Sequence, residues 1–267
     1  TVVVKGIGTG VGVIFTDENA SGNLDNNLTV TYDAVTGTAD SATIKMSSTQ
    51  AATTFGNVTA AGIETLTIDS VGTTDASYKV TGADATTLNL KAGTAAGGTA
   101  DVVAAKVTTL NVTAADDFTV GDGTTAMAKL TSMVLDSTTA AKTITATDLT
   151  YTDDTSKSET VTITTKGVGK VVADFDTDFG TQSATNADTI KIDASANSGG
   201  TTIDLTGHTV VPRYATFTGG SGNDNAIVSK GSLDEYDTFA LGEGTEDVIT
   251  TTVTLTGNVT NVFYTDT

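Results

Sequence analysis

Residues 65–112, TLTIDSVGTTDASYKVTGADATTLNLKAGTAAGGTADVVAAKVTTLNV, repeat one short pattern at a constant distance. The pattern is a box of small polar, apolar, any, apolar. It occurs at Thr65–Ile68, Thr87–Leu90 and Thr109–Val112, so its first apolar residue is Leu66, then Leu88, then Leu110. Apolar residues at every second position are typical of a half-buried β-strand. We therefore expect each repeat to add one such strand to the same sheet.

The same box continues beyond this stretch. It returns at Ser132–Leu135, Thr160–Ile163 and Thr189–Ile192, and the step between boxes is constant at first and longer in the later ones. One strand box every ~20 to ~30 residues is typical of a solenoid, in which each coil completes its core only against its neighbours. Loop insertions account for the longer steps. The residues expected to form one inward row are Leu66, Leu88, Leu110, Met133, Val161 and Ile190, with Thr65, Thr87 and Thr109 facing outward.

Further strand-like segments leave a second architecture open. Leu28–Tyr32 and Ala42–Met46 alternate as half-buried strands do, and Ala100–Ala104 and Lys142–Ala146 lie between the boxes. Frequent short strands with turns between them are also typical of β-sandwiches. The sequence predicts an all-β fold of the β-solenoid or parallel β-helix kind, with tandem β-sandwich domains as the alternative. Helix is limited to a single turn at Ala126–Leu130.

The amino-acid composition limits the kind of core and the classes of function that this chain can have. Aromatic residues make up only 5% of the 267 residues and Trp is absent, so the core must consist of small and β-branched side chains, which suit β-sheets. The net charge of −19 argues against nucleic-acid binding, which needs a basic surface. Cysteine is absent, which excludes disulfides and thiolate metal sites. No stretch is long and apolar enough to predict a membrane-spanning helix.

A glycine-rich motif near the end of the chain points to a metal. Gly219-Gly220-Ser221-Gly222-Asn223-Asp224 follows the glycine and aspartate positions of the nonapeptide G-G-x-G-x-D-x-U-x, although Ala226 occupies its hydrophobic position. A looser copy runs from Leu241 to Ile249, LGEGTEDVI. Glycines allow tight turns that direct carbonyl oxygens inward, and aspartate adds the hard oxygen that Ca²⁺ prefers. A glycine turn beside a hairpin is the plain structural alternative.

Together with the Thr- and Ala-rich composition, these two copies resemble the repeat-in-toxin (RTX) proteins exported by type I secretion. Among those proteins, the bacterial surface-layer (S-layer) proteins are the most similar. The step from Asp224 to Asp247 is longer than the about 18 residues that two stacked nonapeptides span. We therefore expect isolated sites and not a continuous calcium roll.

The resemblance implies calcium as the bound cofactor. An Asx-rich loop at Asp17–Asn27 is a second candidate oxygen cage, with ordinary Asx turns as the alternative. The candidate metal-binding residues are Gly219, Gly220, Ser221, Gly222, Asn223, Asp224, Gly242, Gly244, Asp247, Asp17 and Asp25.

Catalysis is not expected. The acidic pairs Asp116-Asp117 and Asp153-Asp154 could supply the two carboxylates of a polysaccharide hydrolase, but neighbouring residues on a strand face opposite sides. The chain has a single Arg (Arg213) and a single His (His208), and no serine lies in a G-x-S-x-G motif. The glycines of residues 6–10 lack the spacing of a phosphate-binding loop and predict a turn between strands.

We expect a structural module of a bacterial surface layer that assembles laterally with calcium. An RTX adhesin segment that binds a cell surface or glycan is the alternative, and a polysaccharide-processing β-helix is a third. The resemblance implies a secreted, cell-surface protein that is anchored to outer-membrane polysaccharide through a region outside this chain. The chain is expected to be a fragment with three segments: 1–55, an N-terminal β segment with the Asx-rich loop; 56–215, the solenoid repeats; and 216–267, the RTX-like motif and terminal strands.

Overall fold

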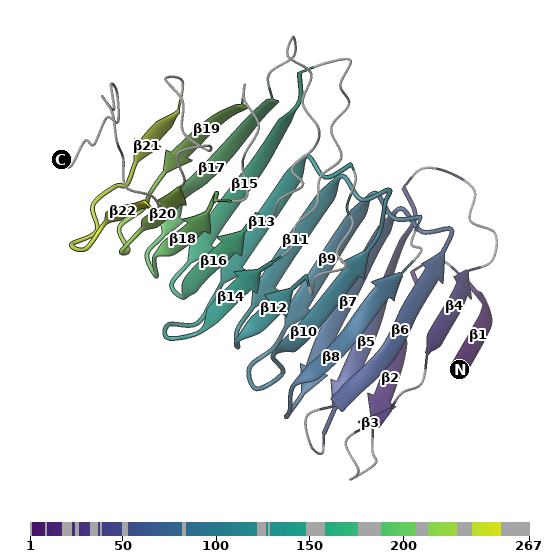
Figure 1. Cartoon of the computed structure of the whole chain (residues 1–267). Coiled ribbons are helices and arrows are strands. Elements are labelled where there is room, and N and C mark those ends of the chain that lie inside the picture. The colour runs from purple at the N-terminus through teal and green to yellow at the C-terminus, as the bar shows by residue number, and fades with distance from the viewer. Residues whose placement is uncertain are drawn as a thin grey trace. The chain divides into compact units, whose positions relative to one another are not determined.

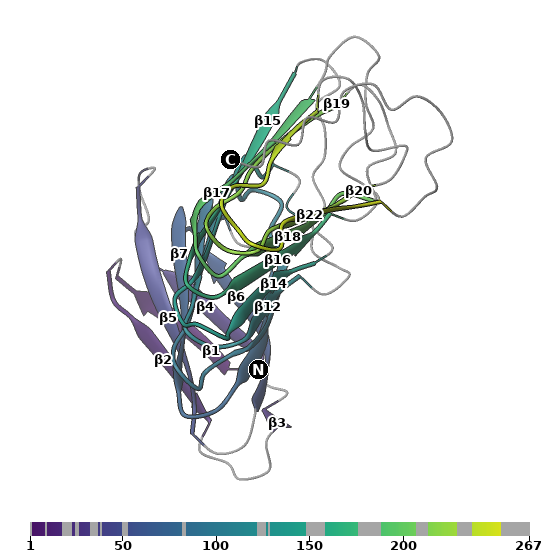
Figure 2. The ribbon, with the colours of Figure 1, turned by 90° about the vertical axis from the view of Figure 1, so that its left-hand side faces the viewer.

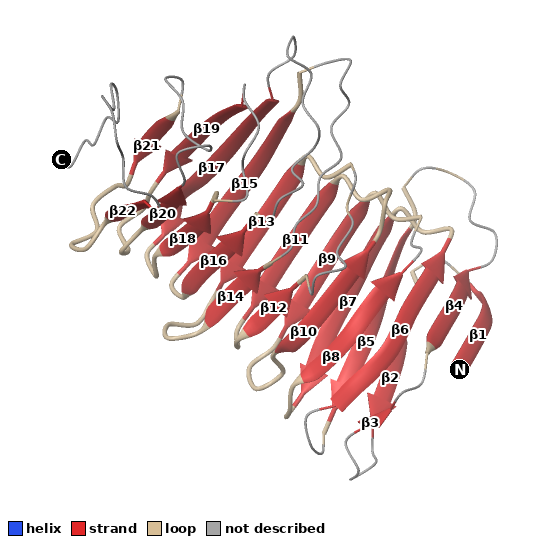
Figure 3. Ribbon diagram, in the orientation of Figure 1, coloured by secondary structure: helices blue, strands red, loops and turns tan. Residues whose placement is uncertain are grey.

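The computed structural model describes residues 2–8, 10–17, 23–24, 27–32, 37, 39–49, 53–81, 84–121, 127, 129–147, 158–175, 188–206, 213–228 and 237–251. Over these residues all regular secondary structure is β-strand, and no helix is present (Figure 3). The chain divides into two compact units, Thr1–Leu130 and Thr131–Thr267. This division falls inside the segment that the sequence assigned to the solenoid repeats.

The first unit contains two parallel sheets, and successive strands from β4 onward alternate between them (Figure 1). One sheet has the order β1-β4-β6-β8-β10-β12, with β3 beside β6, and the other has the order β2-β5-β7-β9-β11. The strands are β1 (Val2–Ile7), β2 (Val13–Asp17), β3 (Asn23–Leu24), β4 (Leu28–Tyr32), β5 (Ser41–Ser48), β6 (Thr53–Ala61), β7 (Thr65–Gly72), β8 (Ala76–Thr81), β9 (Thr87–Ala92), β10 (Gly98–Val103), β11 (Thr109–Ala114) and β12 (Phe118–Val120). Each pair of strands, one per sheet, makes one coil of a β-solenoid.

The second unit repeats this construction. Its sheets have the orders β14-β16-β18-β20-β22 and β13-β15-β17-β19-β21. The strands are β13 (Ser132–Ser137), β14 (Thr143–Ala146), β15 (Thr160–Gly167), β16 (Lys170–Asp174), β17 (Asp188–Asn197), β18 (Thr201–Asp204), β19 (Arg213–Thr218), β20 (Asn225–Val228), β21 (Thr238–Ala240) and β22 (Val248–Thr251). Figure 2 shows the two layers of strands in this unit, β15 and β17 in one and β16, β18, β20 and β22 in the other. The described strand pairs are parallel, whereas β-sandwich sheets are antiparallel, so the sandwich alternative is wrong.

The inward row predicted for the first unit is confirmed. Leu66 pairs with Leu88, and Leu88 pairs with Leu110, each 0% exposed. The threonines at 65, 87 and 109 are paired in the same way on the opposite face of the sheet and are half-buried. Side chains of a strand alternate between the two faces of the sheet. Because the coil length is constant here, each inward-facing residue pairs with an inward-facing residue of the next coil.

In the second unit the predicted row is wrong at one step. Met133 pairs with Ile163 and not with Val161, while Val161 pairs with Ile190 as expected. All four side chains are at most 2% exposed. A shift by two positions leaves the same set of side chains facing inward, so the box pattern cannot distinguish the two registers. The coil from β13 to β15 is longer than the coils from β7 to β11, and its extra residues allow this shift.

Polar side chains also link successive coils on the outer faces. The amide of Asn111 donates to the side-chain oxygen of Asn89 at 2.8 Å, and the amide of Asn89 donates to the hydroxyl of Thr67 at 3.2 Å. Each contact joins residues that are 22 positions apart, which is one coil. The repeat thus specifies the surface contacts as well as the core.

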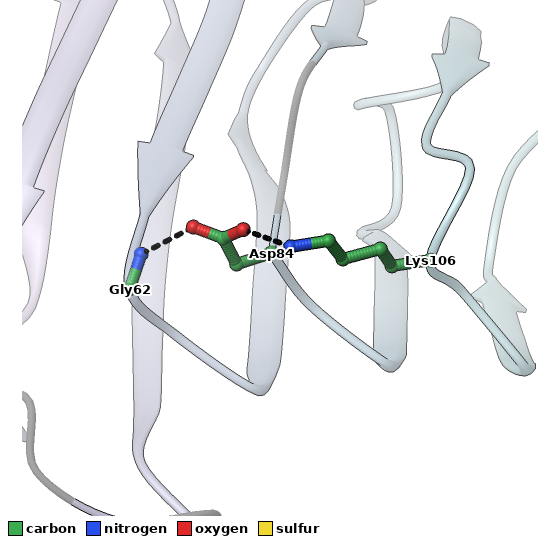
Figure 4. A network of polar contacts seen from close by, with 3 residues as sticks. All are labelled: Gly62, Asp84 and Lys106. Atoms are coloured by element: carbon green, nitrogen blue, oxygen red, sulfur yellow. Dashed lines mark hydrogen bonds and ion pairs between the residues drawn. The ribbon is translucent and has the colours of Figure 1, made fainter.

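One carboxylate joins three successive coils (Figure 4). Asp84 accepts a hydrogen bond from the backbone N–H of Gly62 at 3.0 Å, and its other oxygen lies 2.6 Å from the Lys106 ammonium. The bond to Lys106 and then the bond to Gly62 hold the pKa of Asp84 below its ordinary value. Because both charged side chains are well exposed, an ion pair of this kind contributes about 0–1 kcal/mol. The hydrogen bond from a backbone N–H of the preceding coil is the more general feature, because acids of the second unit accept it too.

The inward row generates a test of the register. Leu110→Asp should prevent folding, because it buries an unpaired charge at a position that is 0% exposed. Leu110→Ala should lower the free energy of unfolding by about 2–5 kcal/mol. Thr109→Asp, on the opposite face, should change it by less than about 1 kcal/mol. Circular dichroism during thermal unfolding measures all three, and equal effects at positions 109 and 110 would contradict the register.

Candidate functional site

The glycine motif forms the turn between β19 and β20, and its looser copy forms the turn between β21 and β22. The coil before them has a related turn, Asn197-Ser198-Gly199-Gly200-Thr201, between β17 and β18. Hydrogen bonds link Thr201 to Asp224 and Asp224 to Asp247, each across a separation of 23 positions. The spacing that departs from stacked nonapeptides is therefore the length of one coil, and the two copies stack directly.

Close approach of the backbone explains two of the glycines. A Cβ atom on Gly220 would overlap the carbonyl oxygen of Asn197 in the preceding coil. A Cβ atom on Gly219 would overlap the carbonyl oxygen of Leu241 in the following coil. The motif is glycine-rich here because successive turns lie directly against one another.

Asp224 lies inside this stack, with 1% of its surface exposed. Its Oδ1 accepts a hydrogen bond from the backbone N–H of Thr201 at 2.6 Å, and its Oδ2 accepts one from Gly220 at 2.7 Å. Burial raises the pKa of Asp224 to about 6, the two N–H bonds act in the opposite direction, and the nearby Asp247 adds a smaller rise. Both carboxylate oxygens are thus used to satisfy backbone donors, one within the turn and one in the preceding coil.

Asp247 repeats the contact one coil later. Its Oδ1 accepts the backbone N–H of Asp224 at 2.8 Å. Beside it, the Asn223 amide donates to Glu246 at 3.3 Å, and the Thr245 N–H donates to the Asn223 side-chain oxygen at 3.2 Å. Asn223, Thr245 and Glu246 are exposed. The contact between Asp247 and Asp224 is therefore partly buried, and the contacts of Asn223 face the solvent.

A buried polar cluster in the preceding coil was not predicted. Asn197 is 1% exposed, accepts the N–H of Gly199 at 2.7 Å, and donates to the Thr201 hydroxyl at 3.2 Å. That hydroxyl lies 2.7 Å from the hydroxyl of Thr165. The pair Gly199-Gly200, one coil before the glycine motif, was the available signal in the sequence. In this turn, amide and hydroxyl groups close the backbone without an acid.

Asp237 is a second acid that the sequence did not single out. It is 9% exposed, and its Oδ1 accepts the backbone N–H of Ala215 at 2.8 Å. The two residues are 22 positions apart, one coil, as in the bonds of Asp224 and Asp247. Buried acids in this unit therefore share one type of partner, a backbone N–H of the preceding coil.

The donor set of the turn differs from that of a closed metal cage. Over the described residues, no group of three or more His, Cys, Asp or Glu side chains converges as metal ligands would. The turn gathers a single buried carboxylate, and an N–H points at each of its oxygens. The acidic side chains around Asp224 thus do not converge as a cage, and the calcium expected there stays a prediction.

The remaining predicted residues are separate from this stack in the chain. Asp17 ends β2, where its backbone pairs with Ser48, and Asp25 lies outside the described residues. Asp116 and Asp117 form the turn between β11 and β12, where the Asp117 N–H donates to Asp116 at 2.8 Å. The other acidic pair, 153–154, and His208 lie outside the described residues, and Arg213 begins β19.

Comparison of the chain with known protein families, with curated proteins and with solved structures found no match. In the part of the chain that the structure describes, no helix has the length and apolar character needed to cross a membrane.

The tight stacking of the turns predicts a position-dependent cost of adding one methyl group. Gly220→Ala should lower the free energy of unfolding by about 1–3 kcal/mol or more, because the new Cβ meets backbone atoms that cannot move independently. Gly8→Ala is the matched control, because nothing lies within 4 Å of the position its Cβ would take. Chemical denaturation compares the two variants. Similar losses would show that the motif glycines do not depend on contact between coils.

Proposed function

We propose that this chain is a structural module of a bacterial surface layer, and that it assembles laterally with other copies through calcium. The observation that carries the proposal is the repeated coil, in which core, backbone and surface contacts recur at a separation of 22 positions from β7 to β11. Such a repeat gives a regular surface that neighbouring molecules can contact in the same way many times. The resemblance to RTX-type surface-layer proteins supports the same function.

The position of the aromatic side chains supports a structural role over sugar binding. Phe55, Phe118, Phe175 and Phe217 are among the largest fully buried side chains, and none of the exposed large hydrophobic residues of the described chain is aromatic. Rings that stack on sugars must be exposed in a groove. Most of the described aromatic residues fill the core instead, which favours a scaffold over an adhesin or a polysaccharide-processing enzyme.

Exposed acids at one edge of each unit support calcium binding there. In the first unit, Asp75 lies in the turn from β7 to β8 and Asp117 in the turn from β11 to β12. In the second unit, Glu243 and Glu246 lie in the turn from β21 to β22. Each of these turns leads from one sheet of its unit to the other. With a net charge of −19, copies brought together at such edges repel one another. Ca²⁺ accepts carboxylates in irregular geometry, so an ion shared between copies converts the repulsion into attraction.

The cellular setting is part of the proposal and rests on the resemblance. It comprises export by type I secretion, a place in the layer at the cell surface, and anchoring to outer-membrane polysaccharide through a region outside this chain.

The test uses the longer protein of which this chain is expected to be a fragment. Calcium is titrated into it, and assembly is followed by light scattering and electron microscopy. We expect ordered sheets above a threshold calcium concentration and dispersal in chelator. Replacing Asp75, Asp117, Glu243 and Glu246 by their amides should raise the threshold. Replacing Thr73, Thr94 and Ser198, exposed neutral residues of equivalent turns, by Ala should leave it unchanged.

High monovalent salt should weaken assembly only in part, because direct coordination is screened less than long-range charge. Monomers at every calcium concentration would reject the surface-layer function and favour the adhesin. Assembly with an equal threshold in the amide and Ala variants would show that these four acids are not the calcium-binding edge.

A further inference from the structure

Acidic side chains of this solenoid bind backbone N–H groups, a role that the calcium motif does not predict. We propose that Asp224 is a latch between coils, a carboxylate that closes the glycine turn by binding backbone N–H groups and not by binding calcium. The inference goes beyond the proposed function, because it concerns how a single chain folds and not how copies assemble.

The geometry of the turn gives the first argument. Asp224 is 1% exposed, and its two oxygens accept hydrogen bonds from Thr201 in the preceding coil and from Gly220 in its own turn. Oδ2 also lies close against Gly219, where an added Cβ would approach it to 2.6 Å. A calcium ion needs six to eight oxygen ligands around it. Here the surroundings of the carboxylate are N–H donors and glycine backbone, which a cation would have to displace.

The recurrence of the contact gives the second argument. Asp247 accepts the N–H of Asp224, and Asp237 accepts the N–H of Ala215, at separations of 23 and 22 positions. In the first unit Asp84 accepts the N–H of Gly62, and Glu64 accepts the N–H of Asp40, at separations of 22 and 24 positions. Most of these acids lie outside any glycine motif. The bond from an acid to the backbone of the preceding coil is therefore a general device of this chain, and Asp224 is one example of it.

The chemistry of the carboxylate explains why position 224 is an acid. Its side chain reaches the backbone of the preceding coil as well as that of its own turn, and each of the two places offers one N–H donor. A carboxylate accepts on both oxygens and so satisfies two such donors at once. An amide accepts on its oxygen only and would turn its own N–H₂ group toward the second donor. An Asn at position 224 therefore leaves one buried N–H without an acceptor.

The test compares the wild-type chain with Asp224→Asn in calcium and in chelator, at a pH well above the pKa of the carboxylate. The variant should melt about 5 °C or more below the wild type in both solutions, because the lost acceptor does not depend on calcium. Any shift that calcium produces in the wild type should persist in the variant. Asp69→Asn, a half-buried acid of β7 outside the glycine turns and outside the proposed calcium edge, is the control and should melt with the wild type.

Hydrogen exchange on the wild-type chain supplies a readout that does not need a folded variant. The amides of Thr201 and Gly220 should be protected from exchange in chelator as strongly as in calcium. Free exchange of these amides in chelator would overturn the latch, as would a calcium-dependent rise in melting temperature that Asp224→Asn abolishes. Neither result bears on assembly, because both are measured on the isolated chain, and copies can still be bridged by calcium at their exposed acids.

Discussion

The parallel pairing of each strand with the strand one coil away is the interaction on which the rest of this structure depends. From β7 to β11 it brings residues 22 positions apart into direct contact, so that a side chain meets its own equivalent in the next coil. Leucine then stacks on leucine inside, and threonine or asparagine on its like outside. One coil alone cannot bury its inner row, and stability therefore arises between coils.

The same geometry gives acids an unusual use. The chain has 32 acidic and 13 basic residues, so its carboxylates cannot all pair one-to-one with a basic side chain. The stacked coils offer them backbone N–H groups, and Asp224, Asp237 and Asp247 each accept one from the preceding coil. Hydrogen bonds to a charged acceptor are stronger than those between neutral groups. Part of the acidic excess thus holds the solenoid together internally, while other acids lie exposed in the turns.

The buried acids and the exposed acids differ in whether we propose that calcium binds them. The proposed surface-layer function places calcium between copies, at turns such as the one that carries Glu243 and Glu246. The proposed latch removes calcium from the interior of the turn at Gly219–Asp224. The two ideas are independent, since one describes contacts within a folded chain and the other describes contacts between folded chains. Under the two proposals together, the chain folds without calcium and assembles with it.

By itself the sequence determined the all-β class and the inward residues, because the strand box recurs with alternating apolar positions. It favoured a solenoid over β-sandwiches, and the parallel pairing of the strands decided between them. The sequence also located the glycine turns. Only the tertiary structure decided the register of β13 against β15, where Met133 meets Ile163, because a slip by two positions conserves the inward pattern. Only the tertiary structure showed what Asp224 binds. The motif identifies an acid beside glycines, but its partner Thr201 belongs to the previous coil, and a local motif carries no information about a neighbour 23 positions away.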